Sequence, residues 1–301
     1  MLAASGGVFS YADARHAGVS ALTLDGLVRR GRILRVRRGA YVAREAWERA
    51  DADERYRLRV RAILRSRPGD AASHHAAVML HGLATWGVDL DRIDLTGSVA
   101  KERYSAGLVI HPTSGREMLT DGWLVEPASD ALAHLTIGSG VTPGVVSMDD
   151  ALRRGACTLD DLRAAVARLP GRHRERVLLA LALCDQLCES VGESRTRIVL
   201  HDLGIPFASQ VDVGDERGFI GRVDFLVDGC VVVEFDGLVK YEGADGRLAL
   251  AAEKQRESRL TDAGYVVVRL IWSDLANPAA VLRTIREAHR RATRLRRRQP
   301  A

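Results

Sequence analysis

Residues 222–240 have the sequence Arg-Val-Asp-Phe-Leu-Val-Asp-Gly-Cys-Val-Val-Val-Glu-Phe-Asp-Gly-Leu-Val-Lys. From Val223 to Val227 every second residue is β-branched or aromatic, which is typical of a half-buried strand. Asp228-Gly229 is a turn signal, and the run Val231–Phe235 predicts a second, buried strand. The segment therefore predicts a hairpin of two short strands.

Acidic residues on this hairpin indicate a site. Glu234 interrupts the buried strand, and burying its carboxylate costs on the order of several kcal/mol unless it is neutralised, paired or bound to a metal. Asp224 belongs to the first strand, and Asp236 follows two residues after Glu234. These three acids predict either a divalent metal site or a structural ion-pair network, which perturbs carboxylates in the same way.

Lysine is rare in this chain, whose other basic residues are arginines. It occurs only as Lys101, Lys240 and Lys254, and two of these follow the acidic cluster. A compact ammonium group with a tunable pKa can orient or deprotonate a water molecule. Lys254 lies on a helix predicted from about Asp245 to Asp262. The alternative is that both lysines form salt bridges or belong to a solvated helix face.

Six short motifs follow one another in this part of the chain. They are Glu189-Ser-Val-Gly-Glu193-Ser-Arg, Gly204-Ile-Pro-Phe-Ala-Ser-Gln210, Arg222-Val-Asp224-Phe, Val233-Glu234-Phe-Asp236-Gly, Lys254-Gln-Arg-Glu-Ser-Arg-Leu and Gly264-Tyr-Val-Val-Val-Arg269-Leu-Ile-Trp272. In this order they resemble the very-short-patch-repair-like branch of the PD-(D/E)XK nuclease superfamily. The resemblance covers about residues 187–290.

The resemblance implies a restriction-endonuclease-like fold, with a central β-sheet flanked by helices. It also implies a DNA endonuclease in which Asp224 and Glu234 hold Mg²⁺ or Mn²⁺, and in which Glu193 faces the same site from the first helix. A divalent ion polarises the phosphoryl oxygen and lowers the pKa of bound water, so it assists phosphodiester hydrolysis.

One position departs from the superfamily pattern, in which a lysine follows two residues after the last acid. Asp236 occupies that place here, and Lys240 comes four residues later. The expected catalytic set is therefore the metal-binding acids with Asp236 and with Lys240 or Lys254, which would stabilise charge or position the nucleophile. The alternative is a nuclease fold that is catalytically inactive and serves only for binding.

The charge of the chain is concentrated at its ends. The formal net charge is +5, but residues 1–44 carry +6 and residues 283–301 carry +7, so the remainder carries −8. Basic ends predict two regions of nucleic-acid contact, because neutralised phosphates release counterions. A solvated helix end is the alternative for the C-terminal region.

The N-terminal basic region also has a pattern. Ser10 and Ser20 are positioned to cap two short helices that are joined by Gly18-Val19, and residues 31–42 predict two strands around an Arg37-Arg38-Gly39 turn. This is the order of a winged helix-turn-helix, whose second helix enters the major groove of DNA. The alternative is a surface that only keeps the domain soluble. The candidate groove residues are Thr23, Arg29 and Arg30, and the candidate wing residues are Arg32, Arg35, Arg37 and Arg38.

Gly39-Ala-Tyr-Val after the basic turn resembles the N-terminal winged-helix domain of AbiEi-type antitoxins, over about the first 45 residues. This resemblance implies a second reading of the function, in which the chain is a transcriptional regulator or antitoxin with an inactive nuclease fold. Its partners would be DNA and a cognate toxin protein. A homodimer on a two-fold DNA site is the usual arrangement of such domains. Four further segments resemble the middle of proteins that join these two ends: Ser73-His-His-Ala-Ala-Val-Met-Leu-His-Gly-Leu83, Ile93-Asp-Leu-Thr, Leu108-Val-Ile-His111 and Val125-Glu-Pro-Ala-Ser-Asp-Ala-Leu-Ala-His134.

The length of 301 residues suggests two or three domains, and 47% apolar residues are ample for packed cores. Together with the two resemblances, this gives a multidomain α+β or α/β protein as the expected fold class. The expected parts are a winged helix-turn-helix domain over residues 1–68, an α/β middle domain over residues 69–186 and a nuclease-like domain with a basic C-terminal helix over residues 187–301. No stretch approaches about 18 uninterrupted apolar residues, and the first ten residues do not resemble a leader. We therefore expect a cytoplasmic protein without membrane contact.

The middle part contains His74, His75 and His81, which together suggest a metal site. No cysteine lies beside them and few acids are near in the sequence. We therefore predict that they occupy the surface and the end of a helix.

Overall fold

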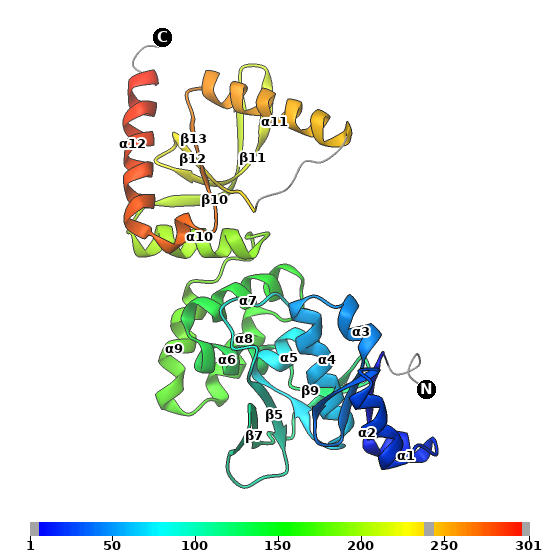
Figure 1. Cartoon of the computed structure of the whole chain (residues 1–301). Helices are drawn as coiled ribbons and strands as arrows, with labels where there is room; N and C mark the ends of the chain where they lie inside the picture. The colour runs from blue at the N-terminus through cyan, green and yellow to red at the C-terminus, as the bar shows by residue number, and fades with distance from the viewer. Residues whose placement is uncertain (1–5, 238–243, 297–301) are drawn as a thin grey trace. The chain divides into compact units, whose positions relative to one another are not determined.

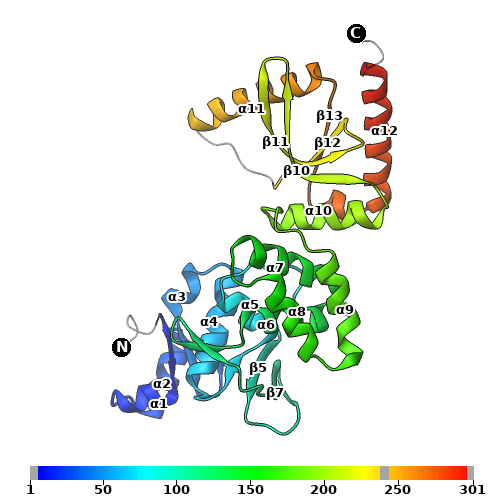
Figure 2. The same cartoon turned by 180° about the vertical axis from the view of Figure 1, so that it is seen from behind.

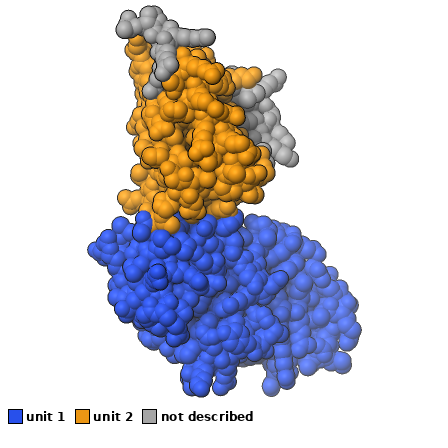
Figure 3. Space-filling view, turned by 90° about the vertical axis from the view of Figure 1, so that its left-hand side faces the viewer, with its two compact units in different colours: residues 1–151, 155–182 blue, residues 152–154, 183–301 orange. Residues whose placement is uncertain are grey.

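The computed structural model describes residues 6–237 and 244–296 of the chain. The chain divides into two compact units, which Figure 3 colours separately. Unit 1 comprises residues 1–151 and 155–182, and unit 2 comprises residues 152–154 and 183–301. The described residues form three sheets together with many helices, so the predicted mixed α/β multidomain class is confirmed.

Unit 1 begins with two capped helices and a small antiparallel sheet. The Ser10 hydroxyl accepts a hydrogen bond from the Asp13 N–H at 3.1 Å, and Asp13 accepts one from the Ser10 N–H at 2.8 Å, which forms a capping box. Ser20 caps the second helix through the Thr23 N–H. The strand order is β1-β3-β2. The elements are β1 (Val8–Ser10), α1 (Tyr11–His16), α2 (Ala21–Arg29), β2 (Ile33–Arg37) and β3 (Ala40–Ala43).

The rest of unit 1 is a six-stranded mixed sheet with helices around it (Figure 1). The strand order is β6-β7-β5-β4-β9-β8, in which β5 with β7 and β4 with β9 are parallel. The strands are β4 (Ala71–Ala72), β5 (Ile93–Gly97), β6 (Arg103–Ser105), β7 (Leu108–Pro112), β8 (Met118–Thr120) and β9 (Trp123–Val125). The helices are α3 (Arg44–Arg49), α4 (Ala52–Arg65), α5 (His74–Leu80), α6 (Ala128–Ser139), α7 (Val141–Arg153), α8 (Leu159–Arg168) and α9 (Gly171–Ala182).

Unit 2 contains a four-stranded sheet in the order β10-β11-β12-β13. The predicted hairpin is confirmed: β11 and β12 are antiparallel, and Asp228 and Gly229 both have positive φ, as the tight turn between them requires. β12 and β13 are parallel, and α11 connects them. The elements are α10 (Val191–Asp202), β10 (Phe207–Asp215), β11 (Gly218–Val227), β12 (Val231–Phe235), α11 (Ala244–Asp262), β13 (Val266–Leu270), the short 3₁₀ helix η2 (Asp274–Ala276) and α12 (Pro278–Arg296).

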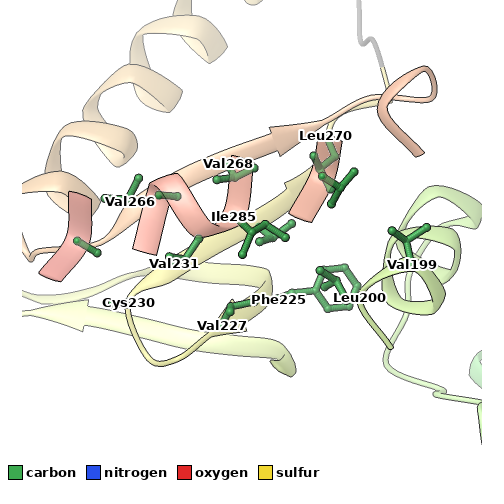
Figure 4. Packing of buried hydrophobic residues seen from close by; sticks show 14 of the residues in the cluster. Val199, Leu200, Phe225, Val227, Cys230, Val231, Val266, Val268, Leu270 and Ile285 are labelled. Carbon is green, nitrogen blue, oxygen red and sulfur yellow. The ribbon is translucent and has the colours of Figure 1, made fainter. Parts of the chain in front are cut away.

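Helices cover both faces of this sheet, with α12 and α11 on opposite sides (Figures 1 and 2). Val231 and Val233 of β12 pack with α10 and α12, as Figure 4 shows for Val231 and its neighbours. Val232, which points the other way, packs with Leu260 of α11. Glu234 has the same parity as Val232, so the strand directs it toward the side of α11.

Candidate functional site

The two acids of the hairpin lie beside each other on neighbouring strands. Phe225 of β11 pairs with Val233 of β12. Continuing the same antiparallel register away from the turn by one residue places Asp224 opposite Glu234. The Phe235 N–H donates to Asp224 Oδ2 at 2.9 Å, which fixes the carboxylate at the end of the ladder. The structure therefore brings together two of the acids that the sequence predicted for the site.

Glu193 joins them from the first turn of α10. The side chain is 8% exposed, and its Oε2 accepts hydrogen bonds from the Glu189 N–H and from Gln210 Nε2, both at 2.9 Å. The Glu193 N–H donates to Ser190 Oγ, so both the backbone and the side chain of Glu193 are hydrogen-bonded at the start of the helix. Its carboxylate is thus fixed rather than mobile.

The negative charges of Glu193 and Glu234 change the pKa of Asp224. The pKa of the Asp224 carboxyl is raised to about 6, first because the group is buried and then because of the negative charges of Glu193 and Glu234. The Phe235 N–H and the Arg256 guanidinium partly oppose this rise. Two carboxylates that raise the proton affinity of a third in this way mark a place where a cation would be stabilised.

Arg256 of α11 already supplies part of that positive charge. Its Nη2 donates to Glu234 Oε1 at 2.6 Å and to the Arg222 carbonyl at 2.9 Å. Arg269, which neighbours Glu234 across the parallel ladder, approaches Glu234 Oε2 to 3.8 Å. The side chains of Glu234 and Arg256 are only 14% and 22% exposed, so this ion pair is shielded from solvent. Sequence reasoning missed Arg256, although it lies in the quoted Lys254-Gln-Arg motif.

The remaining predicted residues are exposed or lie outside the described part. Asp236 is exposed, and its N–H donates to the Leu270 carbonyl. Lys254 is exposed on α11, about 200° around the helix from Arg256, so the helix directs it away from Glu234. Lys240 lies outside the described residues.

The donor chemistry of this site suits Mg²⁺ or Mn²⁺, because carboxylate oxygens are the ligands that these ions prefer. Glu193, Asp224 and Glu234 are not among the groups of described residues whose ligand atoms all lie within 4.8 Å of one another. An ion would therefore draw the three carboxylates closer, and Glu234 would exchange its bond to Arg256 for one to the ion. The residues fit a metal in type and charge, with that rearrangement.

The candidate DNA-contacting residues form an exposed basic surface on α2 and the β2–β3 hairpin. Thr23 lies in the first turn of α2, where its hydroxyl is 2.9 Å from that of Ser20. A register shift between Arg35 and Arg37 bends β2 just before the turn. The exposed members of the predicted set are Thr23, Arg29, Arg30, Arg32, Arg35 and Arg38.

Arg37 differs from the other members of this set. Its Nη1 donates to the Ala106 carbonyl at 3.1 Å, and its Nη2 donates to the Ser105 carbonyl at 2.9 Å and to the Ser105 hydroxyl at 2.7 Å. The guanidinium thus attaches the β2–β3 hairpin to the turn between β6 and β7. This role was not visible in the local sequence, because the partners are almost seventy residues away.

The prediction that these histidines occupy the surface and the end of a helix is wrong for His75. His75 is 4% exposed and its Nε2 lies 2.9 Å from the Arg92 carbonyl. His74 lies between other histidine rings, with Asp94 and Glu126 nearby. These acids are distant in sequence and come close only through the sheet. His81 does end helix α5, as predicted, with its Nε2 2.7 Å from the Glu126 carbonyl.

Comparison with known proteins concerns the N-terminal part of the chain. No curated protein matches the sequence. No helix among the described residues has the length and apolar character needed to cross a membrane. Residues 1–44 match the AbiEi_4 family model, which is described as a transcriptional regulator, AbiEi antitoxin. The N-terminal part of the chain is thus similar to AbiEi antitoxin-type regulators.

Proposed function

We propose that the protein binds DNA through a winged helix-turn-helix within residues 1–68 and hydrolyses phosphodiester bonds at the carboxylate site of unit 2. The observation that carries the hydrolytic part is the convergence of Glu193, Asp224 and Glu234 from three different elements, with the pKa of Asp224 raised to about 6. Buried like charges are unfavourable unless a cation compensates them. On this proposal unit 2 is a restriction-endonuclease-like domain.

Asp224, Glu234 and Glu193 would hold Mg²⁺ or Mn²⁺, which when bound supplies a Lewis acid for a phosphoryl oxygen. Arg256 and Arg269 lie beside Glu234 and offer guanidinium groups that can stabilise negative charge on a phosphate. Gln210 and the N-terminus of α10 keep Glu193 oriented toward the site. Lys240 and Lys254 remain candidates for a second cationic contact with the substrate.

A cleavage assay tests the hydrolytic proposal. Supercoiled, linear and single-stranded DNA are incubated with the purified protein and Mg²⁺, Mn²⁺ or EDTA. We expect cleavage that requires the metal and that falls by at least about 100-fold in Glu234→Gln and Asp224→Asn, because each loses a charged ligand. Glu216→Gln, in the exposed turn between β10 and β11, is the matched control and should retain full activity.

A second candidate function is favoured by the short Glu234–Arg256 ion pair. On this reading the guanidinium permanently replaces the metal, and the protein is a regulator or antitoxin that binds an operator and a cognate toxin without cutting DNA. Absence of cleavage by folded wild-type protein under every metal condition, with DNA binding intact, would favour this candidate. Residual cleavage that is equal in wild type and Glu234→Gln would indicate a contaminating nuclease.

DNA binding itself is tested by substitutions in the β2–β3 hairpin. We expect Arg35→Ala and Arg38→Ala each to weaken binding across all sequences and to reduce the slope of log K against log salt by about 1, because each loses one phosphate contact. Arg37→Ala should weaken binding by loosening the hairpin from Ser105 and Ala106. Arg163→Ala on α8, exposed and far along the chain, serves as the control. If neither these substitutions nor added salt changes the affinity for DNA, this interface is ruled out.

A further inference from the structure

A second cluster of ionisable side chains lies in unit 1. Two parallel strands of the six-stranded sheet, β4 and β9, pair through Ala72 and Val125. The chain leaves both strands at the same edge, so His74 and Glu126, which follow them closely, emerge side by side. The full cluster consists of His74 at the start of α5, Asp94 on β5, His111 on β7, Glu126 after β9 and His134 on α6.

His74 lies at the centre of this cluster. Its ring stacks on that of His111 at 4.3 Å and on that of His134 at 5.0 Å, with interplanar angles of 20° and 24°. His74 has φ of +50°, a left-handed conformation that costs a residue with a side chain about 1 kcal/mol. Glu126 Oε2 accepts a hydrogen bond from the His74 N–H at 3.3 Å, and Ser73 Oγ lies 3.0 Å from His74 Nδ1. The fold therefore holds this imidazole in a fixed orientation.

The ligand atoms form two overlapping groups, each within 4.8 Å: His74 with Asp94 and His111, and His74 with Glu126 and His134. The charge of Asp94 is already neutralised, because Arg92 donates to both of its oxygens and His111 Nε2 lies 2.7 Å away. Asp94 therefore needs no further cation.

The charge of Glu126 is compensated by fewer groups than that of Asp94. It is 1% exposed, and among the residues that the structure describes its ion-pair partner is His134, whose Nδ1 lies 3.1 Å from Oε2. This buried carboxylate thus has one imidazole as its charged partner, whereas Asp94 has a guanidinium and an imidazole.

We infer that His74, Glu126 and His134 form a binding site for one divalent transition metal ion of the zinc type. Two imidazole nitrogens and one carboxylate oxygen are the ligand set of zinc sites that keep a fourth position open. Imidazole ligands favour Zn²⁺ over Mg²⁺. The side chain of His134 is 31% exposed, which gives the ion a path from solvent. On binding, bonds to the ion replace the Glu126–His134 contact, and any proton on the ligating nitrogens leaves to solvent.

His111 would act as a positioning residue for this site. Its Nδ1 lies 3.0 Å from Glu102 Oε1 and its Nε2 contacts Asp94, so the ring is held from both ends while it stacks on His74. Glu102 and Asp94 thus fix the ring against which the proposed ligand His74 packs.

The test is metal binding by the full-length, tag-free protein after removal of metal with EDTA. Titration with Zn²⁺ in a calorimeter should give about one equivalent more for the wild type than for Glu126→Gln, and Co²⁺ should give a visible absorption band of low coordination number that this variant lacks. Glu126→Gln and His134→Ala should each weaken Zn²⁺ binding more than about tenfold. His201→Ala, whose side chain is 56% exposed in unit 2, should bind as wild type does. Zn²⁺ should also raise the Tm of the wild type but not that of Glu126→Gln.

Several outcomes would overturn the inference. These are no Zn²⁺ uptake by folded wild-type protein, Mg²⁺ uptake that Glu126→Gln weakens as much as it weakens Zn²⁺ uptake, or Zn²⁺ binding that His111→Ala abolishes while His134→Ala retains it. Glu126→Gln preserves the size of the side chain, so it decides the question if His134→Ala fails to fold. The variants leave Asp224 and Glu234 unchanged, so this outcome is independent of the cleavage assay.

Discussion

At the scale of single residues, the acids of unit 2 were predictable and their cationic partner was not. Asp224 and Glu234 approach each other because a tight Asp228-Gly229 turn fixes the register of adjacent strands, and that turn is local in the sequence. Arg256 reaches Glu234 only because α11 packs on the sheet, 22 residues further along. How a helix packs on a sheet depends on the side chains of both elements, so the pattern within one short segment does not predict it.

The raised pKa of Asp224 predicts a specific dependence of stability on pH. In the unfolded chain this carboxyl has a pKa of about 3.9, so the native state holds its proton more tightly, and stability falls as the pH rises from about 4 to above 6. In EDTA, Asp224→Asn should therefore be more stable than wild type by about 3 kcal/mol at pH 8 and nearly equal to it at pH 4. Urea unfolding at both values measures this. If the variant and the wild type differ in unfolding free energy by the same amount at pH 4 and pH 8, the raised pKa of Asp224 is not the cause.

At the scale of elements, local signals predicted the helices and strands, while the arrangement of the sheets lay beyond them. The caps Ser10 and Ser20 and the helix predicted over about 245–262 correspond to α1, α2 and α11. The histidine cluster was missed because it depends on the pairing of β4 with β9 and of β5 with β7. A signal existed in the sequence, since all five residues of the cluster lie in the four middle segments quoted for their resemblance.

The close approach of α10 to β12 gives a prediction at this scale. A Cβ atom added to Gly192 would lie 2.0 Å from the Phe235 ring, and that ring also packs edge-on against Trp272. Gly192→Ala should therefore destabilise unit 2 by about 1 to 3 kcal/mol through overpacking, although alanine is the better helix former. Glu193 is the next residue, so DNA cleavage should fall as well. Gly171→Ala, where a Cβ meets nothing within 4 Å, is the control and should not be destabilised. A neutral Gly192→Ala would mean that the helix can move away from the ring.

At the scale of the whole molecule, each unit has hydrophobic cores of its own. In unit 2, two clusters of buried residues lie on the two sides of the four-stranded sheet, and all their members come from residues after 182. The domain boundary expected near residue 186 cannot be derived more finely from sequence, because no proline-rich or low-complexity linker marks it. What defines a unit is which side chains share a core.

Residues 183–301 expressed alone should therefore fold. We expect a cooperative thermal transition by circular dichroism and, on the proposed function, retention of metal-dependent cleavage at reduced DNA affinity because the N-terminal domain is absent. The separately expressed residues 1–182 provide the comparison and should retain salt-sensitive DNA binding. A fragment without a cooperative transition would show that unit 2 depends on the rest of the chain.

The attachment of Arg37 to Ser105 and Ala106 bears on how such proteins can recombine. The family match ends at residue 44, and the expected first domain ends at residue 68, yet Arg37 and Tyr56 both find their acceptors beyond residue 90. A graft of the first 68 residues onto a foreign protein would remove those acceptors and leave the basic hairpin unsupported. The segment that matches the family model is thus shorter than the segment that a functional graft must contain, because the graft must include the acceptors of Arg37 and Tyr56.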